Sequence, residues 1–220
     1  MSSHHIVRDD QEPALIIANG AECSSDLLGQ LLEWSPFIIV LDNAIERVIK
    51  LDLKIDVLLG DFDEDFDTEY YKEKQFPIEI VNTPDQNKTD LEKAFDYLIE
   101  RKIPAVNVVW ATGKRTDHTI TNLTSLVQYR NKLKIVILDD HSKVFLLPTN
   151  FQKWYTAKTI ISLIPIGKVS GITTQNLKYP LEEESLTIGY RTGSSNEVVN
   201  DGIVIINHSQ GDLLLMECVD

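Results

Sequence analysis

Residues 89–111 read TDLEKAFDYLIERKIPAVNVVWA and contain two different hydrophobic patterns in direct succession. Thr89 and Glu92 form the signature of a capping box, which predicts that a helix begins there. The run 105–111 is almost entirely apolar, which is typical of a strand buried on both faces. A helix over 89–101 is further indicated by an apolar stripe at helical spacing, formed by Leu91, Ala94, Phe95, Leu98 and Ile99.

The same alternation extends outward from this stretch through the first two thirds of the chain. Apolar strands separated by amphipathic helices predict a parallel sheet with helices on both faces. We expect an α/β, Rossmann-like nucleotide domain over residues 1–148. The predicted strands are 14–18, 37–41, 56–59, 78–81, 105–111, 133–138 and 143–147, and the other predicted helices are 24–34, 44–51 and 118–129.

The pattern changes after about Pro148, beyond which no amphipathic helix is evident. Strand-like runs at 158–166, 185–190, 202–207 and 212–217 are joined by Gly, Asn, Ser and Pro. We therefore expect a smaller all-β sandwich domain over residues 149–220.

Composition narrows the class of protein. The chain has 220 residues, 43% of them hydrophobic, and a net charge of −13 that argues against non-specific nucleic-acid binding. No apolar run approaches the ~18 residues of a membrane span, and the N-terminus lacks a secretion signal. Cys23 and Cys218 lie at opposite ends of the chain and form no disulfide or zinc pattern. These features predict a cytoplasmic protein without a membrane partner.

Carboxylates gather where the strand 56–59 ends, in the sequence GDFDEDFD at 60–67. Asp61 and Asp63 alternate with Phe62, so in an extended segment both carboxylates face the same side. Such a pair suits Mg²⁺, although an acidic loop exposed to solvent is an equally open interpretation. Ligands of open α/β sheets bind beyond the carboxyl ends of the strands, where Asp42 and residues 112–117 also fall.

Two polar turns accompany this acidic stretch. The segment 83–90, TPDQNKTD, leads into the predicted helix, whose N-terminus attracts anions or is simply capped by Thr89. The segment 110–122, WATGKRTDHTITN, follows a strand and contains Gly113, Lys114 and Arg115, of which Arg115 could pair with phosphate. It lacks the spacing of a P-loop. In the C-terminal part, Tyr179 precedes a proline, and 193–196 predicts a turn.

In order and spacing, these segments resemble the thiamine pyrophosphokinase family. The family pattern DGGAN, GDFDS, DQDxTDxxKA and GxxGxRxDH is matched by Asp42, GDFD at 60–63, DQNKTDLEKA at 85–94 and ATGKRTDHTITN at 111–122. In the C-terminal part, SGITTQNLKYPL at 170–181 and GSSNE at 193–197 match the family's GITTxGLxYPL and GTSNE. The resemblance covers nearly the whole chain.

This resemblance implies transfer of the terminal diphosphate of ATP to the hydroxyl of thiamine, with Mg²⁺, in a homodimer that binds thiamine between subunits. Asp61, Asp63 and Asp90 would be the catalytic and metal-binding residues, with Asp90 or Asp63 accepting the hydroxyl proton. Thiamine would contact Tyr179, Ser195 and Asn196. The residues implied around ATP are Asp42, Asp85, Gln86, Thr112, Lys114, Arg115, Asp117, His118 and Asn122.

Several positions depart from the family pattern. Asn43 and Ala44 replace its double glycine, and an alanine there would be strained if the backbone required a positive φ. Its serine is Glu64, an aspartate is Asn87, and a glycine is Lys114. Two alternatives therefore stay open: a pyrophosphokinase that acts on a pterin-like alcohol, and a non-catalytic module that binds nucleotide or thiamine.

Overall fold

The computed structural model describes residues 13–62 and 66–219, and the chain divides into two compact units between Asp139 and Asp140. This division comes before the boundary predicted after residue 148, because the strand β7 (Ser142–Leu146) pairs with a strand of the second unit. Within the described part of the chain, every helix is too short or too polar to cross a membrane.

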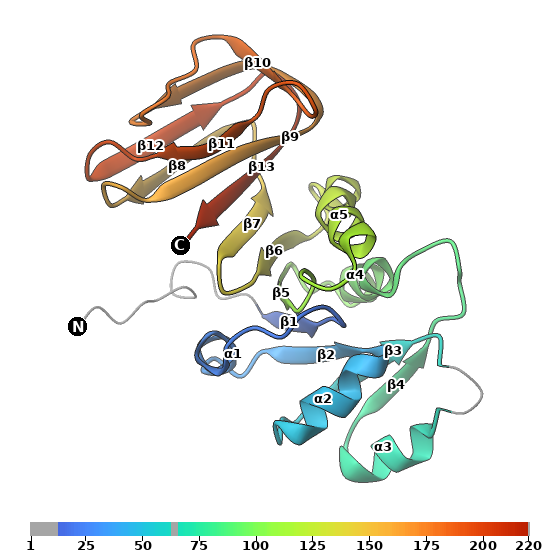
Figure 1. The fold of residues 1–220 in the computed structure, drawn as a ribbon. Helices are drawn as coiled ribbons and strands as arrows, with labels where there is room; N and C mark the ends of the chain where they lie inside the picture. The colour runs from blue at the N-terminus through green and yellow to red at the C-terminus, as the bar shows by residue number, and fades with distance from the viewer. Residues whose placement is uncertain (1–12, 63–65, 220) are drawn as a thin grey trace. The chain divides into compact units, whose positions relative to one another are not determined.

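The first unit is built on a parallel sheet, as the apolar runs predicted (Figure 1). Its strand order is β4-β3-β2-β1-β5-β6. β1, β3 and β5 are buried along their whole length, as expected for strands covered on both faces. The strands are β1 (Ala14–Ile17), β2 (Phe37–Leu41), β3 (Val57–Gly60), β4 (Glu79–Asn82), β5 (Ala105–Val109) and β6 (Lys134–Leu138).

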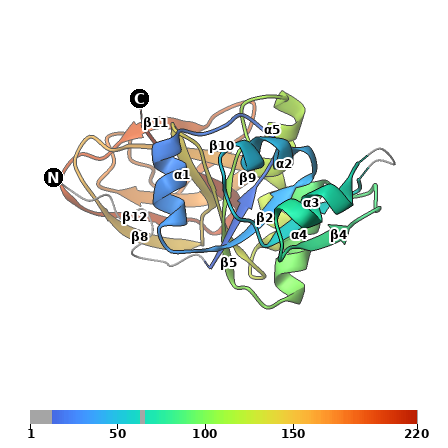
Figure 2. The same cartoon turned by 90° about the horizontal axis from the view of Figure 1, so that it is seen from below.

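Helices lie on both faces of this sheet. Figures 1 and 2 show α2 and α3 on one side of the strands and α4 and α5 on the other. The strand order changes direction at β1, which pairs in parallel with both β2 and β5, and ligands of such sheets bind in the crevice at this point. The helices are α1 (Ser25–Leu32), α2 (Ile45–Lys50), α3 (Thr68–Lys74), α4 (Asp90–Glu100) and α5 (Thr116–Ser125), with short 3₁₀ turns η1 (Asp42–Ala44) and η2 (Leu126–Tyr129).

The ends of these elements have local causes. The predicted capping box of α4 is present: Thr89 Oγ1 accepts from the Glu92 amide at 3.3 Å, and Glu92 Oε2 accepts from the Thr89 amide at 2.9 Å. β5 ends before the predicted 111, because Trp110 has a φ of 57° that no strand accommodates. α3 was not among the predicted helices; Asp67 caps it by accepting from the Tyr70 amide.

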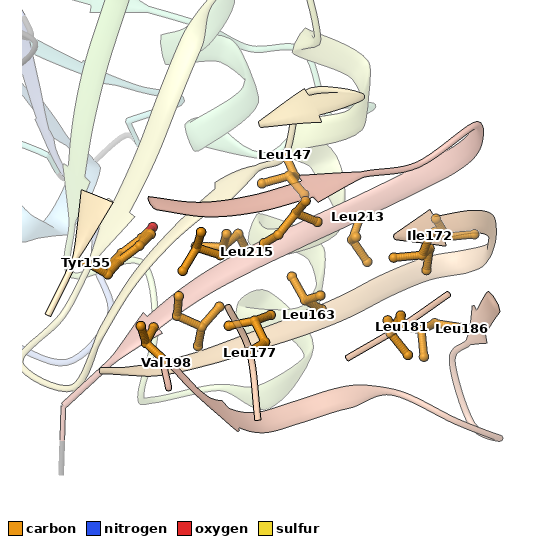
Figure 3. Close-up of a cluster of buried hydrophobic side chains, with 14 residues drawn as sticks. Leu147, Tyr155, Leu163, Ile172, Leu177, Leu181, Leu186, Val198, Leu213 and Leu215 are labelled. Carbon is orange, nitrogen blue, oxygen red and sulfur yellow. The ribbon is translucent and has the colours of Figure 1, made fainter. Parts of the chain in front are cut away.

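In its described residues, 140–219, the second unit has strands joined by turns and loops and no helix. β9 pairs with β13 over most of its length and with β12 near its end, so one long strand takes part in both pairings. Buried side chains such as Leu163, Ile172 and Leu215 gather between these strands (Figure 3). Besides β7, the strands are β8 (Asn150–Tyr155), β9 (Ile160–Gln175), β10 (Glu184–Thr187), β11 (Gly193–Glu197), β12 (Gly202–Asn207) and β13 (Gln210–Cys218).

One prediction for this unit is wrong, and one strand was missed. Residues 193–196 form part of β11, paired with β9, instead of a turn. The pairing is irregular between Gly193 and Asn196, and Ser195 has a φ of 55° there. Small polar residues suit such an irregular strand as well as a turn, which is why the sequence was interpreted as a turn. β8 was not predicted at all. Its sequence contains the polar residues Asn150, Gln152 and Lys153, so it lacks the apolar run by which the other strands were identified.

Candidate active site in the first unit

Three predicted acidic residues meet at the carboxyl edge of the parallel sheet. Asp42 follows β2, Asp61 follows β3, and Asp90 begins α4; one carboxylate oxygen of each lies within 4.8 Å of the others. An all-oxygen donor set at this spacing fits a hard cation such as Mg²⁺. The fourth predicted acid, Asp63, lies outside the described residues.

The backbone brings Asp42 unusually close to Gly60. A Cβ at Gly60 would lie 3.0 Å from the Asp42 Cβ, so any other residue at this position would force Asp42 to shift. Asp42 itself takes the left-handed φ of 34°, and its Oδ2 accepts from Asn43 Nδ2 at 2.7 Å. Ala44 has an ordinary helical φ of −64°. The backbone strain considered for Ala44 is therefore absent, because Asp42 and not Ala44 has the positive φ.

The carboxylates have protein donors as neighbours. Lys93 Nζ lies 3.0 Å from Asp90 Oδ1, and the lysine side chain is only 7% exposed. Gln86 Nε2 donates to Asp61 Oδ2 at 2.8 Å. This hydrogen bond, together with the charge of Lys93, lowers the pKa of Asp61 below its usual 3.8 despite partial burial. The acid at this edge is consequently kept ionised, as metal binding requires.

Lys93 is a site residue that the prediction missed. A signal existed in the sequence: a lysine in the first turn of a helix is disfavoured by the helix dipole unless a nearby acid offsets it. Asp90 stands three residues earlier on the same helix face, and the two side chains meet.

A pocket of about 450 Å³ opens beside the carboxylates. Its walls come from the loops after β1, β2, β3 and β5 and from the beginnings of α4 and α5. Most of the predicted nucleotide residues therefore share one cavity. Among the predicted residues, those lining it are Asp42, Asp61, Gln86, Asp90, Thr112, Lys114, Arg115, His118 and Asn122.

Two predicted residues, Asp85 and Asp117, do not line this pocket. Asp85 Oδ1 accepts from the amide and side chain of Asn87, both at 2.9 Å, and so shapes the turn before α4. Asp117 accepts from the guanidinium of Arg115 at 2.5 and 3.1 Å. That hydrogen bonding lowers the pKa of Asp117 from 3.8 to about 2. Asp117 therefore acts on a residue that lines the pocket, whereas Asp85 bonds to Asn87, which does not line it.

Asn122 and Thr112 are held by the ends of the central strands. Asn122 is buried and donates from Nδ2 to the Ala111 carbonyl at 2.8 Å, which joins α5 to the segment after β5. Thr112 Oγ1 donates to Asp139 Oδ2 at 2.8 Å. Their hydrogen bonds fix the floor of the pocket on the β5 side.

The predicted thiamine residues lie in the second unit. Tyr179 is 62% exposed, whereas Asn196 is buried. Asn196 Oδ1 accepts from the Tyr179 amide at 3.0 Å and its Nδ2 donates to the Tyr179 carbonyl at 2.8 Å. The Ser195 amide donates to Ser162 Oγ at 2.9 Å. Asn196 thus holds the backbone beneath the exposed tyrosine ring.

Comparison with known proteins agrees with this arrangement. The family described as "Thiamin pyrophosphokinase, catalytic domain" matches residues 28–137, which is half of the chain. A second family, "Thiamin pyrophosphokinase, vitamin B1 binding domain", matches residues 149–212. The two matches fall in the two compact units in turn.

Individual relatives give the same result. Thiamine pyrophosphokinase 1 of Oryza sativa subsp. japonica is 32% identical over 73% of this chain and 66% of its own. Thiamin pyrophosphokinase 1 of Caenorhabditis elegans is 25% identical over 93% of this chain and 89% of its own. The fold matches a crystal structure of thiamine pyrophosphokinase from Bacillus subtilis with a TM-score of 0.78, at 24% identity, over 94% of this chain and 99% of that one. On these matches and the motifs they cover, the chain belongs to the thiamine pyrophosphokinase family.

Proposed function

We propose that this protein transfers the terminal diphosphate of ATP to thiamine. The hydroxyl oxygen of thiamine attacks the β-phosphorus, the bond from that phosphorus to the α-phosphate bridging oxygen breaks, and AMP leaves. The observation that carries this proposal is the meeting of Asp42, Asp61 and Asp90 beside a pocket that also contains Lys93 and Arg115. Acids for a metal and cations for phosphates are the parts that phosphoryl transfer needs.

Mg²⁺ is the cofactor that this donor set suits. Asp61 and Asp90 would hold it together with the predicted ligand Asp63, and Asp42 lies within reach of the same position. When bound, the ion neutralises phosphate charge. The role of the protein is then mainly to position the reactants, since this reaction needs little covalent chemistry from side chains.

The other charged groups have separate tasks in this proposal. Arg115 and Lys114 hold the triphosphate from the turn after β5, and Lys93 does so from the first turn of α4. Asp117 orients the Arg115 guanidinium through its two hydrogen bonds. Asp90 or Asp63 accepts the proton that the thiamine hydroxyl loses.

Thiamine recognition is proposed for the second unit. Thiamine is a cation, and the exposed ring of Tyr179 suits such a ligand. Ser195 would contact the pyrimidine ring of thiamine. Asn196 would support this site by holding the Tyr179 backbone. Family membership supports a homodimer with thiamine between subunits. The Rossmann-like and sandwich descriptions and a cytoplasmic location stay predictions.

One assay distinguishes thiamine transfer from its alternatives. Purified protein is incubated with ATP, Mg²⁺ and either thiamine or a pterin alcohol, and AMP is measured. We expect AMP only with thiamine; AMP with the pterin alcohol alone would indicate the alternative acceptor. Nucleotide binding without AMP from any acceptor would refute an enzymatic function. Asp61→Asn should abolish turnover, whereas Asp26→Asn, an acid in the first turn of α1, serves as the control.

The shared site is tested by mixing two inactive variants. Asp90→Asn disables the proposed metal site and Tyr179→Ala the proposed thiamine site, so each protein alone should be inactive. If thiamine binds between subunits, mixed dimers regain activity because one of their sites combines the intact parts of both chains. A monomeric protein in analytical ultracentrifugation, or no return of activity after the two variants have exchanged subunits, would contradict the dimer proposal.

A further inference from the structure

Arg47 of α2 connects the loop after β1 to the segment after β5 without lining the pocket itself. Its NH1 donates to the Gly20 carbonyl at 3.0 Å, and its NH2 donates to Asn19 Oδ1 at 2.8 Å. The guanidinium also stacks over the Trp110 ring, 4.5 Å from its centroid. The side chain is 20% exposed, so these contacts are only partly screened by solvent.

The loop that Arg47 holds is itself packed tightly. The Gly20 amide donates to the Trp110 carbonyl at 2.5 Å and the Ala21 amide to the Thr112 carbonyl at 2.7 Å. A Cβ at Gly20 would lie 2.4 Å from both carbonyl oxygens, so only glycine permits this approach. Asn19 is therefore fixed at the carboxyl end of β1 by its backbone neighbours and by Arg47.

The contact with Arg47 determines how the Asn19 amide is oriented. Arginine has only donors, so the atom facing it must be the amide oxygen of Asn19. The Asn19 NH₂ group remains as a donor on a residue that lines the pocket. Because Oδ1 is bound to Arg47, the group that Asn19 can offer to a ligand in the pocket is the Nδ2 donor.

The order of the strands indicates what this donor meets. The metal-binding acids follow β2 and β3, the cationic turn follows β5, and β1 with Asn19 lies between β2 and β5. A triphosphate that extends from the metal to Arg115 crosses the end of β1. We propose that Asn19 Nδ2 binds a phosphate oxygen of ATP and that Arg47 is the positioning residue that orients it. This inference rests on the proposed use of ATP.

The first test measures binding of ATP and of inorganic tripolyphosphate, each with Mg²⁺, by isothermal titration calorimetry. Arg47→Met should raise both dissociation constants about tenfold, as expected when a hydrogen bond to a charged group is lost. Arg47→Lys should behave similarly, because it keeps the charge but lacks the planar fork. Arg101→Met is the matched control: Arg101 stacks on Tyr97 at the same 4.5 Å, away from the pocket.

The second test asks whether Arg47 acts through Asn19. Asn19→Ala should weaken both ligands about tenfold, and Arg47→Met/Asn19→Ala should bind them no more weakly than Asn19→Ala alone. Unchanged binding in Arg47→Met, full binding in Arg47→Lys, additive effects, or weakening for ATP but not tripolyphosphate would each overturn the inference. Because no thiamine is needed, these outcomes are independent of whether the protein releases AMP.

Discussion

Lys93 is the residue that offsets the negative charge of the clustered acids when no metal is bound. Its ammonium is buried beside Asp90, so its removal leaves carboxylates close together with less compensating charge. Lys93→Met should lower the free energy of unfolding by about 1–3 kcal/mol, measured by urea denaturation in the presence of a chelator. Lys72→Met is the control, since Lys72 makes the same three-residue pairing with Glu69 at an exposed position. Equal losses in both variants would contradict the special role of Lys93.

Gln86 gives a prediction on pH at the same edge. Its hydrogen bond lowers the pKa of Asp61, so the stabilisation from that acid is present above pH 3.8 and is lost as the pH falls through its lower folded value. In Gln86→Leu we expect the pKa of Asp61 to rise toward its usual value, so that the stabilisation above pH 3.8 becomes smaller. Carbon NMR titration of the Asp61 carboxyl group in metal-free protein measures the shift. An unchanged pKa in the variant would show that Gln86 is not its main cause.

At the scale of elements, the first turn of α4 joins helix capping to the candidate site. Thr89 caps the helix that begins with Asp90, and Glu92 also accepts from Gln128 Nε2 at 3.0 Å. Thr89→Ala should reduce the free energy of unfolding by ~1 kcal/mol in chemical denaturation. Thr124→Ala in α5 is the control, because its hydroxyl bonds back to the Ile120 and Thr121 carbonyls of its own helix and alanine favours the helix. A neutral Thr89→Ala would contradict the importance of the capping box.

Elements with strong hydrophobic periodicity could be predicted from the sequence, and elements defined by irregular pairing could not. α4 and β2 show why: one has a complete apolar stripe and a cap, the other is apolar throughout. β11 looked like a turn because its Gly-Ser-Ser-Asn sequence contains a bulge that only the partner strand β9 explains. Asp42 and Asp61 could be placed at one edge from strand order, and Asp90 through the family resemblance, whereas the contact between Arg47 and Trp110 required tertiary packing.

On the scale of the whole molecule, each compact unit has its own buried side chains. Leu163 is fully buried within the second unit, among the residues of Figure 3. Leu163→Ala should lower the free energy of unfolding of that unit by about 2–5 kcal/mol in denaturant titration. We expect the dissociation constant for ATP to stay unchanged at low temperature, because the candidate pocket is lined by the first unit alone.

The control for this prediction is Ile203→Ala, whose side chain is 55% exposed on β12 and should matter little for stability. If Leu163→Ala weakens ATP binding while the first unit stays folded, the assignment of the nucleotide pocket to that unit alone is contradicted. Calorimetry of ATP binding, combined with circular dichroism of the α-helices, separates these outcomes.

The backbone of Asp42 also bears on how relatives of this chain are found. The unusual dihedral angle belongs to the aspartate, and Ala44 stands where the family pattern has a glycine, without any distortion. The backbone of this chain therefore does not require a glycine at that position. A search pattern that insists on the glycine pair would pass over enzymes like this one, while a pattern built on the aspartate and the later Gly60, which approaches it closely, would retain them.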